Sequence, residues 1–425
     1  MSSNRLFYGW WVLAGIFSSY TALVGVQVYA LPLFYPELTK EFGWSNQSIS
    51  YAATIFFLTG ASITPFVSSL FDRYSARIFM IVGGCLTVAG LLAYRSMETL
   101  THLILIYVVL AFSQVCAGQV PTILIVTRWF RRHRGIAIGI TLTGTTVGGG
   151  VFSLVFRHIM ANGGWRDAII VFTIISAVMM LIPYIFLIRS RPEDKGLLPD
   201  GDAEKQMDRP SREKIRTGPT LKEAIRNPVF YILALTTGAL WFTMNGIYNN
   251  QSFFMSEELG LSTGTYSLIF SAIFWFAITG KILFGYLSDH FDKILIMCIV
   301  VIMLLIGLAF LRLSSADDLL YLYGYAAVFG LGFGGTFALI QLVIAEFFAG
   351  QSYGKILGIL TAVDVACGGL GISVLAEMER FYGSYLPVIE ILMGLTGVMV
   401  LLVIVLYRIR RNHLNKLEAS PEVAD

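Results

Sequence analysis

Twelve long apolar runs occupy most of this 425-residue sequence and leave few folds open to it. A helix needs about 20 consecutive apolar residues to cross the hydrocarbon core of a bilayer. Only 13% of the residues are charged, compared with about 25% in soluble domains. The sequence therefore predicts an all-α integral membrane protein. The expected transmembrane helices are 9–35, 46–71, 77–96, 100–127, 134–158, 166–188, 228–255, 263–287, 293–312, 318–345, 355–378 and 386–407.

One long polar segment, 189–227, divides these runs six and six. Its charges, prolines and glycines are typical of a linker, so we expect an N-terminal bundle at 1–188 and a C-terminal bundle with a tail at 228–425. Similar sequences recur 219 residues apart, as at 135–139 and 354–358. Such internal duplication predicts two pseudo-symmetric six-helix bundles with a central site.

The basic residues predict the orientation of the chain in the membrane. With both termini in the cytoplasm, the cytoplasmic segments hold 23 of the 30 Lys and Arg residues, and the outer segments hold six. Cytoplasmic loops normally carry this excess of positive charge. We therefore expect a multi-pass protein of the cell (inner) membrane with both termini and the linker in the cytoplasm. We expect it to act as a monomer and to bind no nucleic acid.

The sequence lacks the residue patterns of enzymes and metal sites. Its four cysteines lie within apolar runs and have no metal-ligand spacing. There is no nucleophile–base set and no phosphate-binding glycine loop. The sequence therefore predicts neither catalysis nor a bound metal or cofactor.

Lys281 is the most unusual residue of the chain, because no other Lys or Arg lies so far inside an apolar run. A charge at this depth costs about 2.5–3.5 kcal/mol on insertion scales. Such a residue usually faces the protein interior or a water-filled cavity. We therefore expect Lys281 to bind the anionic group of a substrate.

One acidic residue, Asp364, lies in the middle of the eleventh run. A carboxyl group at this depth that gains and loses a proton would couple transport to a proton gradient. Two other roles are open: a permanent ion pair with Lys281, or recognition of a cationic group on the substrate.

The seventh run carries polar residues at a helical spacing. Trp241, Asn245 and Asn249 are four residues apart and share one face. The amides could recognise substrate hydroxyls or carboxylates, or they could form bonds between helices worth under about 1 kcal/mol each. Four further candidates for substrate contact are Tyr29, Gln119, Phe337 and Gln341.

Two loops at expected cytoplasmic helix ends carry an acid followed by basic residues. Asp72 and Arg73 follow the second run, and Asp289 follows the eighth run 217 residues later. These charges could pair with neighbouring helix ends as a gate, or they could be solvated at the interface. Glu346, near Lys355 in sequence, is expected to belong to the same gate or interface structure.

The six-plus-six helices and the two loops resemble the major facilitator superfamily. Three further stretches, 8–11, 32–45 and 129–139, resemble its monocarboxylate-transporter-like branch, which includes oxalate/formate carriers. The resemblance implies that Lys281 stands at the position of the basic residue of that branch, usually Arg, and pairs with a substrate carboxylate. Lysine lacks the bidentate fork of arginine. Ala277 stands where animal members carry an acid.

The residues and the resemblance together predict a transporter that works by alternating access. We expect proton symport of a small organic monocarboxylate, such as lactate or pyruvate. The alternatives are an exporter, an exchanger or a carrier of a zwitterion on the same fold, or a membrane sensor that transports nothing.

Overall fold

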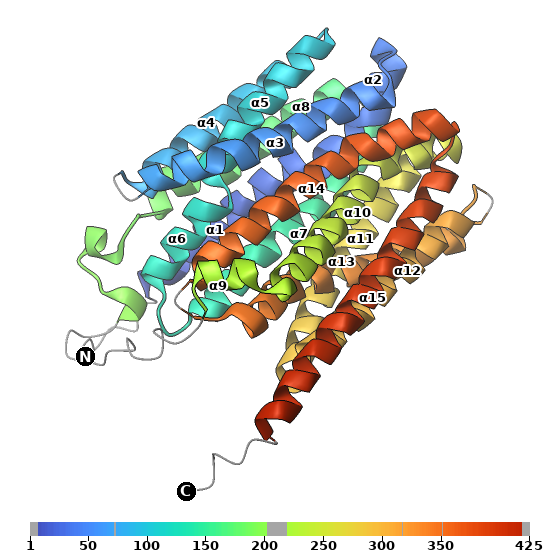
Figure 1. Ribbon diagram of the computed structural model, residues 1–425. Coiled ribbons are helices and arrows are strands. Elements are labelled where there is room, and N and C mark those ends of the chain that lie inside the picture. The colour runs from blue at the N-terminus through green and yellow to red at the C-terminus, as the bar shows by residue number, and fades with distance from the viewer. Residues whose placement is uncertain (1–6, 72–73, 202–218, 317, 351, 419–425) are drawn as a thin grey trace, which may run out of the picture. The chain divides into compact units, whose positions relative to one another are not determined.

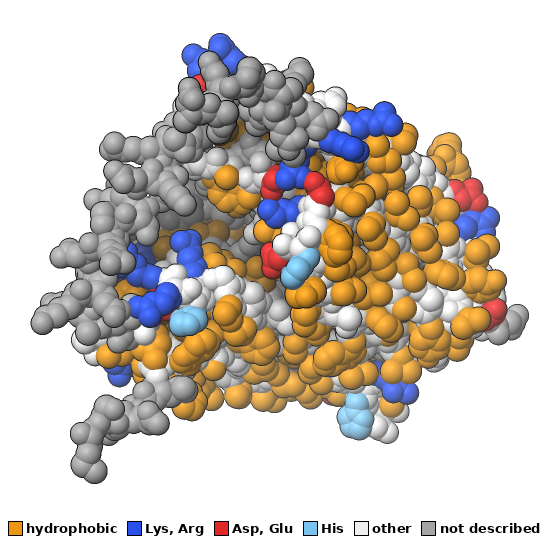
Figure 2. All heavy atoms as spheres, turned by 90° about the horizontal axis from the view of Figure 1, so that it is seen from below, with side chains coloured by type: hydrophobic (Ala, Val, Ile, Leu, Met, Phe, Trp, Pro, Cys, Tyr) orange, Lys and Arg blue, Asp and Glu red, His pale blue; other side chains and the backbone are white. Residues whose placement is uncertain are grey.

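The computed structural model of the protein describes residues 7–71, 74–201, 219–316, 318–350 and 352–418 (Figure 1). Within these residues all regular secondary structure is helical. Twelve helical stretches are long and apolar enough to cross a membrane, so the predicted fold class is confirmed. Figure 2 shows hydrophobic side chains over much of the visible described surface, with charged side chains in a few clusters.

The helices follow one another in the order of the predicted spans. The first six spans contain α1 (Tyr8–Val24), η1 (Gly25–Ala30), η2 (Leu31–Phe34), α2 (Tyr35–Phe42), α3 (Asn46–Leu70), α4 (Ala76–Arg95), α5 (Leu100–Ala117), α6 (Gln119–Trp129), α7 (Arg134–Met160), α8 (Trp165–Ser176), η3 (Ala177–Leu181) and η4 (Pro183–Leu187). The linker contains η5 (Pro192–Lys195), η6 (Pro199–Gly201) and α9 (Leu221–Arg226). The last six spans contain α10 (Pro228–Phe253), η9 (Phe254–Glu258), α11 (Thr263–His290), α12 (Lys293–Leu313), α13 (Leu319–Phe348), α14 (Tyr353–Tyr382) and α15 (Tyr385–Glu418).

The contacts divide the chain into two compact units. Unit 1 comprises Met1–Pro210, Tyr248–Trp275 and Ile372–Glu377, and unit 2 comprises Ser211–Ile247, Phe276–Gly371 and Met378–Asp425. In unit 1, α5 packs beside α3 and α4, and α1 packs beside α7 (Figure 1). In unit 2, α12 packs beside α13 and α15. One section each of α10, α11 and α14 therefore belongs to unit 1.

Several predicted spans, the first and the fourth among them, are less regular than their hydrophobicity suggests. The first span changes from α-helix to a π-helix at Gly25 and to a 3₁₀-helix at Leu31, next to Pro32. Proline has no N–H to donate, which removes one helical hydrogen bond. The fourth span breaks between α5 and α6 at Gly118, whose backbone leaves the helical region at φ −80° and ψ −141°.

Glycines bring α11 and α13 into direct backbone contact in unit 2. A Cβ atom added to Gly334 would lie 2.0 Å from the carbonyl oxygen of Ala277, and one added to Gly280 would lie 2.2 Å from that of Leu331. Small residues allow helices to approach this closely in membranes. This contact positions the next residue of α11, Lys281, against α13.

Gly334→Ala is expected to destabilise unit 2, because its new methyl group meets backbone that cannot rotate away. Overpacking of this kind costs about 1–3 kcal/mol. Gly285→Ala on the same helix is the matched control, since a Cβ added there meets nothing within 4 Å. Thermal unfolding in detergent should show a lower midpoint for Gly334→Ala only. Equal midpoints for the two variants would contradict the close contact.

The linker is attached to the loop between α6 and α7 through Asp200. Its Oδ2 accepts hydrogen bonds from the backbone N–H groups of Arg132 at 2.7 Å and Arg131 at 2.8 Å. Partial burial raises the pKa of Asp200, but these hydrogen bonds outweigh it and hold the pKa below its usual range. The stabilisation is therefore present above the unfolded pKa of about 3.9 and is lost only as the pH falls further.

Candidate functional site

Lys281 lies against aromatic rings in unit 2. Its Nζ is 4.5 Å from the centroid of the Phe337 ring, which comes from α13. The ring of Trp241, from α10, lies 5.8 Å from that of Phe337. All three side chains are half-buried. A cation over an aromatic face gains about 0.5–2 kcal/mol, depending on how far it is desolvated. The three residues, hereafter the Lys281 cluster, therefore combine one positive charge with apolar walls.

Asn245 is packed between α10 and α14. Its side chain is 6% exposed, and its Nδ2 donates to the carbonyl oxygen of Trp241 at 3.3 Å. A Cβ atom added to Gly368 on α14 would lie 2.9 Å from this nitrogen. The glycine therefore leaves room for the amide between the two helices. Asn245 therefore fills the space between α10 and α14, and its hydrogen bond to Trp241 lies within α10.

Asp364 is a buried acid on α14, with 3% of its surface exposed. Its carboxyl group interacts with the hydroxyl of Thr237 on α10, and its Oδ1 makes no hydrogen bond of ordinary geometry within the described residues. An ionised carboxylate without partners is costly in apolar surroundings. A permanent hydrogen-bonded pair with Lys281 through this oxygen is therefore not seen in the described part of the chain.

The remaining candidates for substrate contact have different environments. Tyr29 and Asn249 are buried in unit 1, with 7% and 2% of their surfaces exposed. Gln119 is exposed at the first position of α6, next to the break at Gly118. Gln341 is half-buried on α13 in unit 2, where its carbonyl oxygen accepts a hydrogen bond from the hydroxyl of Tyr353 at 3.2 Å. Among the predicted contacts, Phe337 lies against the ammonium of Lys281.

The structure describes one of the three residues that the sequence predicts for the gate. Asp72 and Arg73 lie outside the described residues. Asp289 is exposed in the last turn of α11.

An ion-pair network between α12, α13 and α15 includes Glu346, which the sequence assigns to the gate or interface structure. Arg410 of α15 contacts both Asp292 and Glu346, and Lys293 contacts Glu346 at 2.8 Å. Asp292 also caps α12 by accepting from the N–H of Ile294 at 2.9 Å. The partners of Glu346 are therefore on α12 and α15. An Asp before a helix is a capping signal, but nothing in the sequence links it to Arg410.

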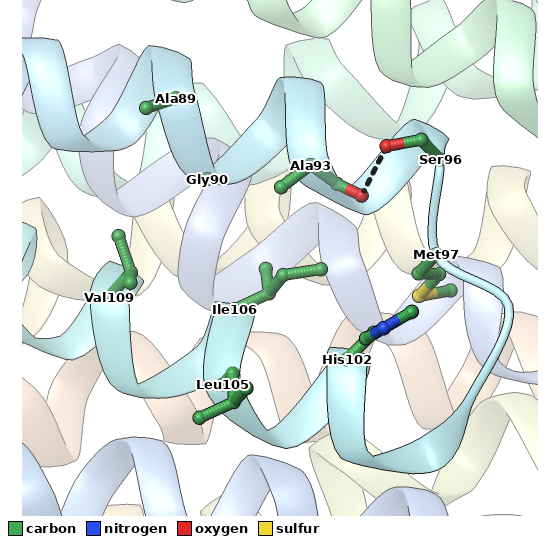
Figure 3. Close-up of a pocket in the computed structure, with 9 residues that line it drawn as sticks. All are labelled: Ala89, Gly90, Ala93, Ser96, Met97, His102, Leu105, Ile106 and Val109. Carbon is green, nitrogen blue, oxygen red and sulfur yellow. Dashed lines mark hydrogen bonds between the residues drawn. The ribbon is translucent and has the colours of Figure 1, made fainter.

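A separate pocket of about 470 Å³ lies along α4 and α5 (Figure 3). Its lining is apolar apart from Ser96 and His102, and the Ser96 hydroxyl donates to the carbonyl oxygen of Ala93 at 3.2 Å. None of the candidate residues lines it. The candidate site therefore rests on the Lys281 cluster and Asp364, not on this pocket.

Several known proteins similar to this chain are named as transporters. It is 25% identical over 387 residues to the MFS transporter asaE of Aspergillus flavus, which covers 89% of this chain and 78% of that protein. It is 27% identical over 169 residues to monocarboxylate transporter 13 of Bos taurus, which covers 40% of this chain and 39% of that protein. The crystal structure of a bacterial homolog of the human lysosomal transporter Spinster, inward-facing and unoccupied, matches with a TM-score of 0.67 at 17% identity over 95% of each chain.

The family follows from a match along nearly the whole sequence. The profile of the Major Facilitator Superfamily matches residues 16–372 and 246–423. The twelve candidate spans and the similarity to a solved structure agree with this match. The chain therefore belongs to the major facilitator superfamily.

Proposed function

We propose that this transporter carries a small organic monocarboxylate across the cytoplasmic membrane. The observation that supports this most is the Lys281 cluster, which places an ammonium group and two aromatic rings together within the spans of unit 2. The substrate carboxylate binds the Nζ of Lys281, and its apolar part contacts Phe337 and Trp241. A monocarboxylate fits because one cation neutralises one carboxylate, and the cluster offers no second basic group to a dicarboxylate.

The proposed energy source is a proton gradient acting through Asp364. The protonated acid is neutral and is tolerated in its buried position. Release of the proton toward the cytoplasm would leave an unfavourable buried carboxylate at Asp364. The acid is therefore protonated while the substrate is carried, and the proton and the substrate cross the membrane together. In this proposal both termini are cytoplasmic, the protein acts as a monomer in the inner membrane, and the bundles 1–188 and 228–425 are joined by the linker 189–227.

Ligand binding to the purified protein tests the proposed substrate class. We expect lactate and pyruvate to raise the thermal unfolding midpoint, because a ligand that binds only the folded state stabilises it. Their methyl esters are the matched controls, since they keep the shape and lose the charge. Equal stabilisation by acid and ester would exclude recognition of the carboxylate. Stabilisation by alanine or a betaine, with none by lactate, would favour the zwitterion carrier, in which Asp364 binds the cationic group.

A further inference from the structure

The pocket along α4 and α5 is a surface groove with a closed floor. Gly90 and Ile106 line its floor and are buried. A Cβ atom added to Gly90 would lie 2.8 Å from the Cδ2 atom of Leu110, so the two helices are in direct contact there. Ala89 and Ala93 of α4 are exposed beside the floor and carry only methyl groups. The groove exists because these small side chains leave the space beside the helix contact unfilled.

The groove is polar at one end and apolar at the other. Ser96 and His102 lie at the end next to the loop between α4 and α5, and Ala89 and Val109 lie at the opposite end (Figure 3). Two membrane spans meet at this loop, so its residues lie where the hydrocarbon core gives way to lipid headgroups. A phospholipid has the same order of groups, with a polar headgroup at the membrane surface and acyl chains beneath it.

His102 is held so that one of its ring nitrogens is a hydrogen-bond donor. Its backbone N–H donates to the hydroxyl of Thr99, the N-cap of α5, at 3.2 Å. Its Nδ1 accepts from the backbone N–H of Glu98 at 3.4 Å. A neutral imidazole that accepts at Nδ1 carries its proton on Nε2. Because His102 is exposed, this N–H can donate to an acceptor in the headgroup region, such as a phosphate oxygen.

The charges beside the polar end of the groove have opposite signs. Arg95, the last residue of α4, and Glu98, in the loop, are both exposed. The hydroxyl of Ser96 donates to the carbonyl oxygen of Ala93 at 3.2 Å, so its oxygen is left as an acceptor. Recognition favours a ligand whose charges complement those of the site. A zwitterionic headgroup therefore fits this end better than an anionic one.

The size of the groove distinguishes an acyl chain from a helix as its occupant. Ala89 and Ser96 are seven residues apart, so the groove follows α4 for about 10 Å. A helix about 10–12 Å across occupies on the order of 1,000 Å³ over that length. The groove holds about 470 Å³, roughly half of this volume. An acyl chain is narrower than a helix and can lie in the groove along its whole length.

We propose that this groove binds one zwitterionic phospholipid of the outer leaflet. An acyl chain lies between Ala89 and Val109, and a phosphate oxygen accepts the Nε2 proton of His102. The bilayer is as apolar as the groove, so the chain alone gives little selectivity, and the phosphate contact supplies it. The leaflet follows from the orientation proposed above, in which the loop between α4 and α5 lies outside. The site itself rests on membership of a membrane-protein family and not on the proposed substrate.

Native mass spectrometry of the purified protein in a mild detergent tests the site. The probe is phosphatidylethanolamine, and diacylglycerol with the same acyl chains is the control that lacks the phosphate. We expect the protein to bind one phosphatidylethanolamine about ten times more tightly than diacylglycerol, because a hydrogen bond to a charged group contributes about this factor. His102→Ala should remove that difference and leave the binding of diacylglycerol unchanged.

A matched pair of variants tests whether the lipid lies in the groove. Ala93→Phe should bind phosphatidylethanolamine on the order of ten times more weakly, because the new ring occupies the space of the acyl chain. Leu92→Phe should bind it like the parent, since Leu92 is exposed on the same helix but does not line the groove. Thermal unfolding midpoints of the two variants check that both are folded.

Three results would overturn the proposal. Equal binding of phosphatidylethanolamine by folded Ala93→Phe and Leu92→Phe would place the lipid elsewhere. Equal binding of phosphatidylethanolamine and diacylglycerol by the parent would exclude recognition of the phosphate. Dimers that retain no lipid and are lost in Ala93→Phe would show that a second copy of the chain covers the groove. None of these measurements uses a transport substrate, so each result would leave the proposed function standing.

Discussion

Replacing Lys281 by alanine should lower the affinity for a monocarboxylate by on the order of 100-fold and abolish measurable uptake, because loss of one partner of a desolvated charge pair costs about 2–5 kcal/mol. The other two residues of the Lys281 cluster, Phe337 and Trp241, offer the substrate apolar contact but no positive charge. Binding would be measured by the thermal shift of the purified protein, and uptake with radiolabelled lactate in proteoliposomes.

Two further variants separate charge from packing at this position. Lys281→Arg keeps the charge and should retain part of the binding. Phe337→Leu removes the ring under the ammonium but keeps the charge, so it should weaken binding much less than Lys281→Ala. Lys281→Ala should unfold at the same or a higher temperature, because a buried charge is costly. Wild-type affinity in Lys281→Ala would exclude Lys281 as the anion site.

Replacing Asp364 by asparagine should abolish accumulation driven by a proton gradient while exchange of substrate across the membrane continues. The amide matches the size of the carboxyl group but cannot ionise, so it cannot take up and release a proton during transport. With one proton per substrate, a gradient of one pH unit supports about tenfold accumulation, since tenfold corresponds to about 1.4 kcal/mol. With Asp364→Asn, the substrate should only reach the same concentration on the two sides of the membrane. Counterflow and gradient-driven uptake in the same vesicles measure the two activities.

Two control variants show whether this effect belongs to Asp364. Glu98→Gln removes an exposed acid from the loop between α4 and α5 and should leave coupling intact. Thr237→Val removes the hydroxyl on the facing helix and should change the pH dependence of uptake without abolishing coupling. If Asp364→Asn still accumulated substrate with the same pH dependence, Asp364 would not be the coupling group.

The spans could be predicted because length and hydrophobicity alone decide whether a segment can cross a bilayer. Lys281 and Asp364 were found by the same logic, since a charge inside an apolar run has to be used or neutralised. A charged residue within an apolar run can be recognised without knowing which helices are neighbours in the fold. Phe337 was expected near the substrate, and the structure places its ring against Lys281.

Other features depend on which helices are neighbours, and the sequence does not state this. The contact of Arg410 with Asp292 joins residues 118 positions apart, on α15 and at the start of α12. The hydroxyl of Tyr248 donates a hydrogen bond to the carbonyl oxygen of Tyr29, 219 positions away in the sequence. Pro32 and Gly118 lie where the first and fourth spans become irregular, but hydrophobicity treats them as ordinary positions within a span. The packing of Asn245 against Gly368 likewise requires the neighbouring helix to be known.

The most direct measurement of the central claim is uptake of labelled lactate and pyruvate into proteoliposomes with an imposed inward proton gradient. The wild-type protein should accumulate at least one of these acids only while the gradient lasts, and Lys281→Ala should accumulate none. Folded wild-type protein that accumulates neither acid, or that accumulates one equally well with Lys281→Ala, would contradict proton-coupled monocarboxylate transport through Lys281.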